Sequence, residues 1–209
     1  LHEATLPPAG CLATPEVYIS AEGDGGTTDF SPQDAPASVY TPTVGESVTL
    51  FADNFETGQG WVAENLGASS GDWQRGIPVN DPSWAYDPES DSDGSGQCYL
   101  TQNEPGNTDV DDGAVQLTSP AVNMSGGHVT ISYDYFLRLT DTDGADRILV
   151  EISGDGETGP WTEIARHDTD GGLSWRHWDI TQDDLDTAGV TLTDTMMLRF
   201  TTNDADAQG

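Results

Sequence analysis

Two acidic loops hold the residues of this sequence that are best suited to binding a metal ion. The first spans residues 87–96 and contains the run Asp91-Ser92-Asp93-Gly94. The second contains three closely spaced aspartates, Asp141, Asp143 and Asp146. Carboxylate oxygens on a loop turned by glycine suit Ca²⁺, which takes about six to eight oxygen ligands. The second loop starts like an EF-hand loop, but Ile152 stands at its twelfth position, so it is not one. A structural Ca²⁺ and a pair of ordinary acidic turns both explain these loops.

Two aromatic residues stand in a polar, proline-containing loop at residues 80–88. They are Trp84 and Tyr86, and Pro82 and Pro88 flank them. Aromatic side chains on such a loop are suited to stacking against sugar rings or against a partner protein. The alternative is that the loop folds back and its aromatics cover the body of the domain. Trp61, Trp73 and Trp161 instead occur in strand-like contexts, where a role in the core is expected.

Motifs for catalysis are weak. The run Gly67-Ala68-Ser69-Ser70-Gly71 matches the Gly-x-Ser-x-Gly pattern of a nucleophilic serine. That pattern needs a strand before it and a helix after it, whereas Asp72-Trp73 begins another strand-like segment. The histidines lack the His-Glu-x-x-His spacing of zinc hydrolases, and no lysine is present to complete a phosphate-binding loop. We therefore expect a non-catalytic segment. A glycoside hydrolase using paired carboxylates is the least favoured alternative.

The charge balance excludes two classes of partner. The chain has 37 acidic residues against 6 basic ones, all arginine, and a net charge of −31. Such a field repels nucleic acids and anionic membranes, and no apolar run is long enough to span a bilayer. The acidity suits a solvated surface of an extracellular or salt-adapted protein, or cation binding at some of the carboxylates. These two interpretations are compatible.

The two cysteines, Cys11 and Cys98, leave their pairing open. A disulfide between them would suit a secreted protein. Their positions on opposite sides of an expected domain boundary argue against it, and each could pair with a cysteine outside this sequence. They are too few for a structural zinc site.

Alternation of polar and apolar residues predicts an all-β fold. Each alternating run has one apolar and one polar face, as in a half-buried antiparallel strand. These runs are residues 16–21, 47–51, 128–135, 147–153, 161–166 and 196–201. Asp155-Gly156 predicts a hairpin between two of them, although Gly159-Pro160 lengthens the loop. The best helix candidate is short, covers residues 181–188 and is opened by Thr181.

Residues 1–46 are expected to be a separate piece. The strand at Val17-Tyr18-Ile19-Ser20-Ala21, a loop at residues 32–36 and a strand beginning at Ser38-Val39-Tyr40 are its main features. Two strands do not form a stable domain alone. With Ala4-Thr5-Leu6-Pro7, Cys11 and Ala35-Pro36, this stretch resembles the C-terminal part of a fibronectin type III or immunoglobulin-like module of bacterial secreted proteins. The resemblance implies that the first half of that module precedes this sequence.

Residues 47–209 carry ordered landmarks of a second module. The early ones are Asn54-Phe55-Glu56, Gly60-Trp61, Asp72-Trp73, Gly76, Asp93, Gly96, Tyr99 and Leu117-Thr118-Ser119-Pro120. The later ones are Asp146, Val150-Glu151-Ile152-Ser153, Asp155-Gly156 and Trp161. In this order they resemble MAM domains and the related jelly-roll modules of bacterial secreted metallopeptidases, such as immune inhibitor A-type enzymes and zinc carboxypeptidases. The resemblance implies an antiparallel jelly-roll β-sandwich.

The resemblance also implies a cation site near the opening strand. Carried over residue by residue, it points to Asn54, Glu56 and Asp93 as ligands, with Asp53 and Asp111 as additions. Exposed strand positions are the alternative explanation for Asp53 and Glu56. The cysteines of animal MAM domains are missing here, and Asp53 stands where one would be. The family's last strand would follow Asn203-Asp204, so we expect the closing strand to be missing and a sheet edge to be open.

These observations lead to one preferred function and one alternative. The preferred function is a non-catalytic accessory module, secreted or at the cell surface, that attaches a larger protein to an extracellular glycan or protein surface. Its partners would include neighbouring domains of the same parent chain, and the resemblance implies a secreted peptidase among them. The alternative is a structural or adhesive protein whose β-sandwich modules self-assemble through an open edge.

Overall fold

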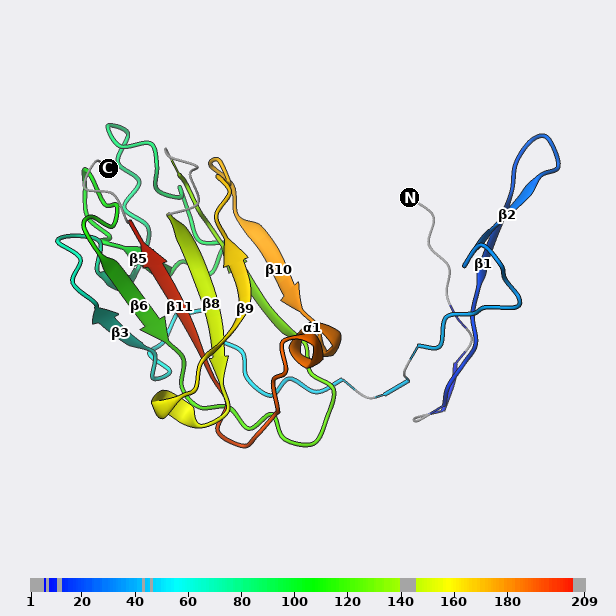
Figure 1. The fold of residues 1–209 in the computed structure, drawn as a ribbon. Coiled ribbons are helices and arrows are strands. Elements are labelled where there is room, and N and C mark those ends of the chain that lie inside the picture. Colours follow the sequence, from blue (N-terminus) through cyan, green and yellow to red (C-terminus); the bar gives the residue numbers. More distant parts are fainter. Residues whose placement is uncertain are drawn as a thin grey trace. The chain divides into compact units, whose positions relative to one another are not determined.

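The contacts within the chain divide it into two units, Leu1–Thr49 and Leu50–Gly209. The computed structural model describes residues 6, 8–10, 13–42, 44–45, 47–139 and 146–204 (Figure 1). The described residues of both units are built from antiparallel strands, and the one α-helix among them is a single short element. The expected all-β fold is therefore confirmed.

The first unit is a hairpin of two short strands. β1 (Ile19–Glu22) pairs with β2 (Thr28–Ser31), and Gly23 and Thr27 close the turn through a backbone hydrogen bond of 3.0 Å. All the residues of both strands are exposed. The strand expected at residues 38–40 is reduced to an isolated bridge between Tyr40 and Val17.

The second unit is built on a five-stranded antiparallel sheet with the order β3-β6-β11-β8-β9. Its strands are β3 (Val62–Asn65), β6 (Ala114–Thr118), β8 (Arg147–Ser153), β9 (Thr162–His167) and β11 (Met197–Asn203). β11 is the last described strand of the chain and lies inside the sheet, paired with β6 on one edge and β8 on the other. The edges of this sheet are β3 and β9, so the open edge does not lie beside the last strand.

Two strand pairs accompany this sheet. β7 (Ile131–Tyr135) pairs with β10 (Arg176–Ile180), and β4 (Trp73–Gly76) pairs with β5 (Cys98–Thr101). The 3-10 turn η1 (Gly156–Thr158) joins β8 to β9, as the Asp-Gly signal predicts. The helix α1 (Gln182–Thr187) is capped by Thr181, which confirms the helix prediction.

The hydrophobic core lies between the large sheet and the β7–β10 pair. Ile148, Val150 and Ile152 of β8 are buried, because every second side chain of a strand points to the same face. They belong to one cluster with Ile131 of β7 and Ile180 of β10. Packing between two antiparallel layers is what a β-sandwich requires. The finer jelly-roll description stays a prediction.

A row of aromatic rings runs through the same core. Phe200 of β11 lies 5.1 Å from Tyr133 of β7, measured between ring centroids, and 6.2 Å from Trp61. The hydroxyl of Tyr133 shares a 2.7 Å hydrogen bond with Nε2 of His167, and Tyr135 stacks on the same imidazole at 3.8 Å. Burial lowers the pKa of His167 to about 4, so this histidine is neutral at neutral pH.

The segment at the start of the second unit differs from its sequence prediction. The strand predicted at residues 47–51 is wrong, since that segment has no strand partner and Val48 and Leu50 are exposed.

Cys98 is a buried free thiol, and burial raises its pKa to about 12. Cys11 lies outside the described residues, so the pairing of the cysteines stays open.

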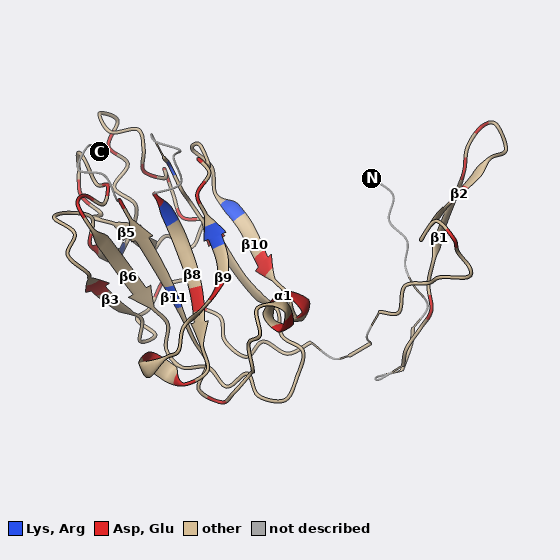
Figure 2. Ribbon diagram, in the orientation of Figure 1, with Lys and Arg blue, Asp and Glu red and all other residues tan. Residues whose placement is uncertain are grey.

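Three of the six arginines form ion pairs with carboxylates within the second unit. Figure 2 shows blue segments on β8, β9 and β10 among more frequent red ones. The nitrogen–oxygen distances are 2.8 Å for Arg138–Asp170, 2.7 Å for Arg166–Glu163 and 2.6 Å for Arg199–Glu151. Pairs this close to solvent contribute modestly to stability. They leave most of the acidic charge uncompensated.

Candidate functional site

Hydrogen bonds to Asp53 organise the opening segment of the second unit. Its Oδ1 accepts a 2.8 Å hydrogen bond from the backbone N–H of Phe55, and its Oδ2 accepts one of 2.9 Å from the Trp61 indole. Phe55 has a φ of 62°, a conformation that a non-glycine residue needs local contacts to maintain. The guanidinium of Arg75 supplies one by donating to the Phe55 carbonyl at 2.7 Å. Both Asp53 oxygens therefore hold the chain and its aromatics in place.

Glu56 joins this segment to the loop that contains Asp93. Its Oε1 accepts hydrogen bonds from the Gln97 backbone N–H at 2.6 Å and from the Ser95 hydroxyl at 3.2 Å. The same hydroxyl lies 3.1 Å from Oδ2 of Asp91, while Oδ1 of Asp93 accepts from the Ser95 backbone N–H at 2.8 Å. The structure thus brings together two of the proposed ligands, Glu56 and the Asp93 loop, from positions far apart in the sequence.

Asp91 is a member of this loop that the ligand assignment did not include. It is buried, and its Oδ2 accepts a 2.7 Å hydrogen bond from the Gly96 backbone N–H. Gly96 has a φ of 136°, and a Cβ there would lie 3.5 Å from Glu56 Oε1. The Ser95 hydroxyl, followed by its backbone N–H, lowers the pKa of Asp93. The loop is therefore held around its carboxylates by protein donors.

The remaining proposed metal ligands are spread over other parts of the unit. Asn54 Oδ1 accepts a long 3.4 Å hydrogen bond from the Glu56 backbone N–H, so it stays beside Glu56. Asp111 Oδ2 accepts from the Ser70 hydroxyl at 2.7 Å, in a different loop. Asp146 is half-buried, whereas Asp141 and Asp143 lie outside the described residues. Within the described part of the chain, no group of three acidic, histidine or cysteine side chains could hold a metal ion.

Glu56 and the loop that contains Asp91 and Asp93 have the oxygen ligands that Ca²⁺ prefers, but these oxygens are not arranged around a common point. Glu56, Asp91 and Asp93 offer hard oxygens on a loop turned by Gly94 and Gly96, the chemistry that Ca²⁺ prefers. One oxygen of each carboxylate already accepts hydrogen bonds from the protein. Ca²⁺ would have to use the other oxygens, after movement of the side chains toward a common point.

Trp84 and Tyr86 form a pair on their loop. Their ring centroids are 4.6 Å apart, and the guanidinium of Arg138 lies 5.2 Å from the centroid of the Tyr86 ring. Arg138 is itself fixed by Asp170, whose carboxylate it meets at 2.8 Å. Both aromatic rings are half-buried. A cation over the face of a tyrosine ring is attractive and limits the motion of that ring.

The loop that carries this pair is tied to the body of the unit at several points. Oδ2 of Asp81 accepts from the Gly106 backbone N–H at 2.9 Å, and Asp87 accepts from the Thr108 hydroxyl at 2.7 Å. The indole N–H of Trp175 donates to the Ser90 carbonyl at 2.8 Å. The loop therefore folds back onto the unit, as one of the two sequence interpretations holds, while its aromatics keep part of their surface in solvent.

Carboxylates near this loop are affected by burial. Burial raises the pKa of Asp87, and the hydrogen bond from Thr108 opposes that effect. Burial also raises the pKa of Asp109, with Asp111 adding repulsion, and Oδ1 of Asp109 is buried without a hydrogen-bond partner. These groups are destabilised in their charged form, which limits how much further negative charge this side of the unit can hold.

The serine motif does not have the surroundings of a nucleophile. β3 ends at Asn65 and β4 begins at Trp73, so residues 67–71 connect two strands instead of leading into a helix. The Ser70 hydroxyl donates to Asp111, and the Ser69 hydroxyl donates to Asp112 at 3.1 Å. Both serines therefore act as donors to acidic neighbours in a turn.

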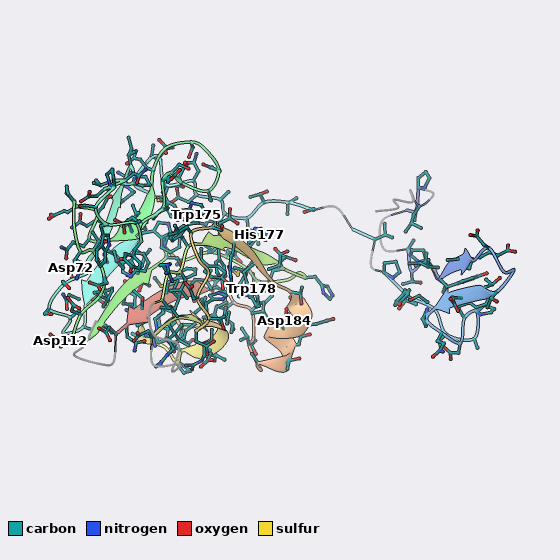
Figure 3. The ribbon with its side chains drawn as sticks, turned by 90° about the horizontal axis from the view of Figure 1, so that it is seen from above. Asp72, Asp112, Trp175, His177, Trp178 and Asp184 are labelled. Carbon is teal, nitrogen blue, oxygen red and sulfur yellow. The ribbon has the colours of Figure 1, made fainter. Side chains whose placement is uncertain are left out.

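Hollows on the described surface include two that are defined by their lining residues. One, of about 530 Å³, lies at the ends of β6, β8 and β11. The smaller, about 170 Å³, lies between β3 and β4. Figure 3 labels Asp72 of the smaller hollow and Asp112 of the larger one on the side of the unit away from Trp175, His177 and Trp178.

The comparisons with family models and with curated proteins give no match for this chain. No family model matches the sequence, and no curated protein is similar to it. Among the described residues, no helix has the length and apolar character needed to cross a membrane.

Proposed function

We propose that the second unit is a non-catalytic binding module that attaches a larger extracellular protein to glycans. The observation that carries this proposal is the Trp84–Tyr86 pair, held by Arg138 on a loop that is tied to the sandwich. Aromatic rings offer apolar faces for the C–H groups of a sugar and lose little entropy when the loop is already fixed. The resemblance to jelly-roll modules of secreted peptidases supports the extracellular setting and the larger parent chain.

The test of this proposal is binding to insoluble polysaccharides and to a glycan array. Trp84→Ala removes half of the aromatic pair, and Trp178→Ala is the matched control because Trp178 is 42% exposed on β10. We expect Trp84→Ala to weaken binding about tenfold, the loss that one stacking contact supports, while the control binds normally. Equal binding by both variants, or no binding by the native protein, would overturn the proposal.

We also propose that Ca²⁺ stabilises this module by linking Glu56 to the Asp91 and Asp93 loop. A ligand that binds only the folded state adds about 2.7 kcal/mol when it is present at about 100 times its Kd. Melting temperature should therefore rise in Ca²⁺ relative to excess chelator. Glu56→Gln should lose most of that rise, whereas Glu157→Gln, an exposed change in η1, should keep it. A native protein with the same melting curve in both buffers would contradict the Ca²⁺ proposal.

A second candidate function, self-assembly into an adhesive surface, is favoured by the edge strand β3. All of β3 is exposed, and Val62 and the adjacent Leu66 are 47% and 53% exposed. An unpaired strand edge is a template for pairing with another chain. The molecular mass in solution separates the two functions. A monomer over a wide concentration range favours the binding module, and a concentration-dependent oligomer favours assembly.

A further inference from the structure

The smaller hollow is bounded by two strands that belong to different sheets. β3 contributes Ala63, Glu64 and Asn65 from the edge of the large sheet, and Asp72 and Trp73 come from the start of β4. The hollow, about 170 Å³ in volume, lies between the large sheet and the β4–β5 pair. It lies on the side of the unit marked by Asp72 in Figure 3, away from Trp175.

The polar groups of this hollow are held in position by their neighbours. The Asn65 amide donates to Oδ1 of Asp72 at 2.6 Å and to the Ala68 carbonyl at 3.0 Å. The Gln116 amide donates to Oε2 of Glu64 at 3.3 Å. Each carboxylate thus has one oxygen fixed by an amide and a second oxygen able to accept another hydrogen bond.

Trp73, which also lines the hollow, carries an uncompensated donor. Its indole Nε1 is buried and has no hydrogen-bond partner. A buried donor without an acceptor destabilises the fold, so it needs an explanation such as a ligand or a bound water. Because Nε1 is covered, a ligand group would reach it only after a small movement of the ring or its cover. An acceptor that enters the hollow would remove this cost.

These groups select among classes of ligand. No cationic side chain lines the hollow, so phosphate, sulfate and uronate are disfavoured beside Glu64 and Asp72. An ammonium or guanidinium group would suit the carboxylates but has no lone pair to accept from the Trp73 N–H. A hydroxyl group donates to a carboxylate and accepts from an N–H at once. Neighbouring hydroxyls on a ring with apolar C–H faces match the full set.

We propose that the hollow between β3 and β4 binds a neutral sugar residue, with Asp72 and Glu64 accepting from its hydroxyls and Trp73 donating to one of them. This inference deepens the proposed function, because it rests on glycan binding by the module and names neutral sugars as the ligand class. It places that contact at a site separate from Trp84, so the two assignments can fail independently.

The experiment titrates the full chain with methyl glycosides of glucose, galactose, mannose and N-acetylglucosamine. The indole N–H signals are followed by NMR, and the signal of Trp73 is identified as the one missing from Trp73→Phe. We expect one glycoside to shift that signal. Trp73→Phe and Asp72→Asn should each weaken binding about tenfold, the effect of losing one hydrogen bond to a charged or buried group. Asp112→Asn, a neighbouring exposed change outside the hollow, should bind as the native protein does.

Two further measurements distinguish this site from the loop site and a sugar ligand from a cationic one. Trp84→Ala should keep the glycoside response even if it loses polysaccharide binding, which would distinguish failure of the loop site from failure of this one. Methylguanidinium tests the cationic alternative. A Trp73 signal that no glycoside shifts, or one that only methylguanidinium shifts, would overturn the proposal. Asp72→Asn and Trp73→Phe are compared only where their circular dichroism matches that of the native protein.

Discussion

The β1–β2 hairpin and the β8–β11 pair use the same antiparallel hydrogen bonding but differ in what they bury. Ile19 of β1 is 64% exposed, whereas Ile152 of β8 is 1% exposed. β8 and β11 lie within a five-stranded sheet whose inner face packs against β7 and β10. Among the described residues of its own unit, the hairpin has no such second layer. Two strands with paired backbones are therefore not equivalent to a folded core.

This difference shows where the stability of the chain resides. Backbone hydrogen bonds replace bonds to water and contribute little net free energy, while burial of apolar area contributes about 25 cal/mol per Å². The first unit has its hydrogen bonds and almost no burial, and Ala35 is its buried apolar residue among those described. The second unit has both. Substitutions of like residues in the two units should therefore have unlike effects.

The largest expected effect comes from matched isoleucine substitutions. Ile152→Ala should lower the free energy of unfolding by about 2–5 kcal/mol, because it leaves a cavity in the packed core. Ile19→Ala should change the same quantity by less than about 0.5 kcal/mol, because its side chain is mostly in water. Urea unfolding followed by far-UV circular dichroism measures both, because all six tryptophans lie in the second unit and their fluorescence would not follow the first. Equal losses in the two variants would break the comparison between the units.

A smaller loss of stability is expected in acid, because the core of the second unit contains the buried histidine His167. Burial lowers the folded-state pKa of His167 to about 4, below its ordinary value of 6.5. The unfolded state therefore binds a proton more readily, and stability is lost as pH falls from about 6.5 to about 4. The loss is up to about 3 kcal/mol. Urea unfolding near pH 7 and near pH 4.5 measures it.

His167→Gln should remove that part of the pH dependence while keeping a partner for the Tyr133 hydroxyl. The exposed His177 provides the contrast. Its hydrogen bond with Asp134 raises its pKa, so its contribution is present below about 6.5 and is lost as pH rises through the raised value. If His167→Gln loses as much stability in acid as the native protein, the burial argument for His167 is wrong.

The smallest effect tests local hydrogen bonding alone. Thr181 caps α1 by accepting from the Asp184 backbone N–H, and the Asp184 carboxylate accepts from Thr181 in return. Thr181→Ala should cost about 0.5–2 kcal/mol in thermal or urea unfolding. Thr187→Ala, exposed in the same helix, serves as its control. A cost as large as that of Ile152→Ala would mean that capping, and not burial of Leu185, positions this helix.

Strand prediction from the sequence succeeded where alternation coincides with a packed layer. Residues 147–153 and 161–166 became β8 and β9 nearly as expected, because Val150, Ile152 and Ala165 have a core to face. Residues 47–51 have the same alternation but no partner strand, so they form no regular secondary structure. Alternation reports which face could be buried, and only the rest of the fold supplies the surface that buries it.

In the candidate sites, too, the sequence predicted which residues take part but not which residues they contact. Carboxylates with glycine identified the Asp93 loop, and the resemblance placed Glu56 opposite it. Neither gave the burial of Asp91 or the donors of Ser95 and Gln97 that connect the two segments. Likewise, Trp84 and Tyr86 could be selected as loop aromatics, but Arg138 over the Tyr86 ring comes from the segment after β7, about fifty residues away. Contacts of that separation leave no periodic signal in one sequence.

The sequence by itself determined the all-β class, the short capped helix, the acidic surface and the choice of residues with oxygen and aromatic chemistry. These depend on side-chain type and on periods of a few residues, which are local properties. Only the tertiary structure decided that β11 lies inside the sheet, that His167 is buried among tyrosines, and that Asp72 and Trp73 meet β3 around a hollow. The physical reason is that pairing order and burial are set by competition among all the strands for one core.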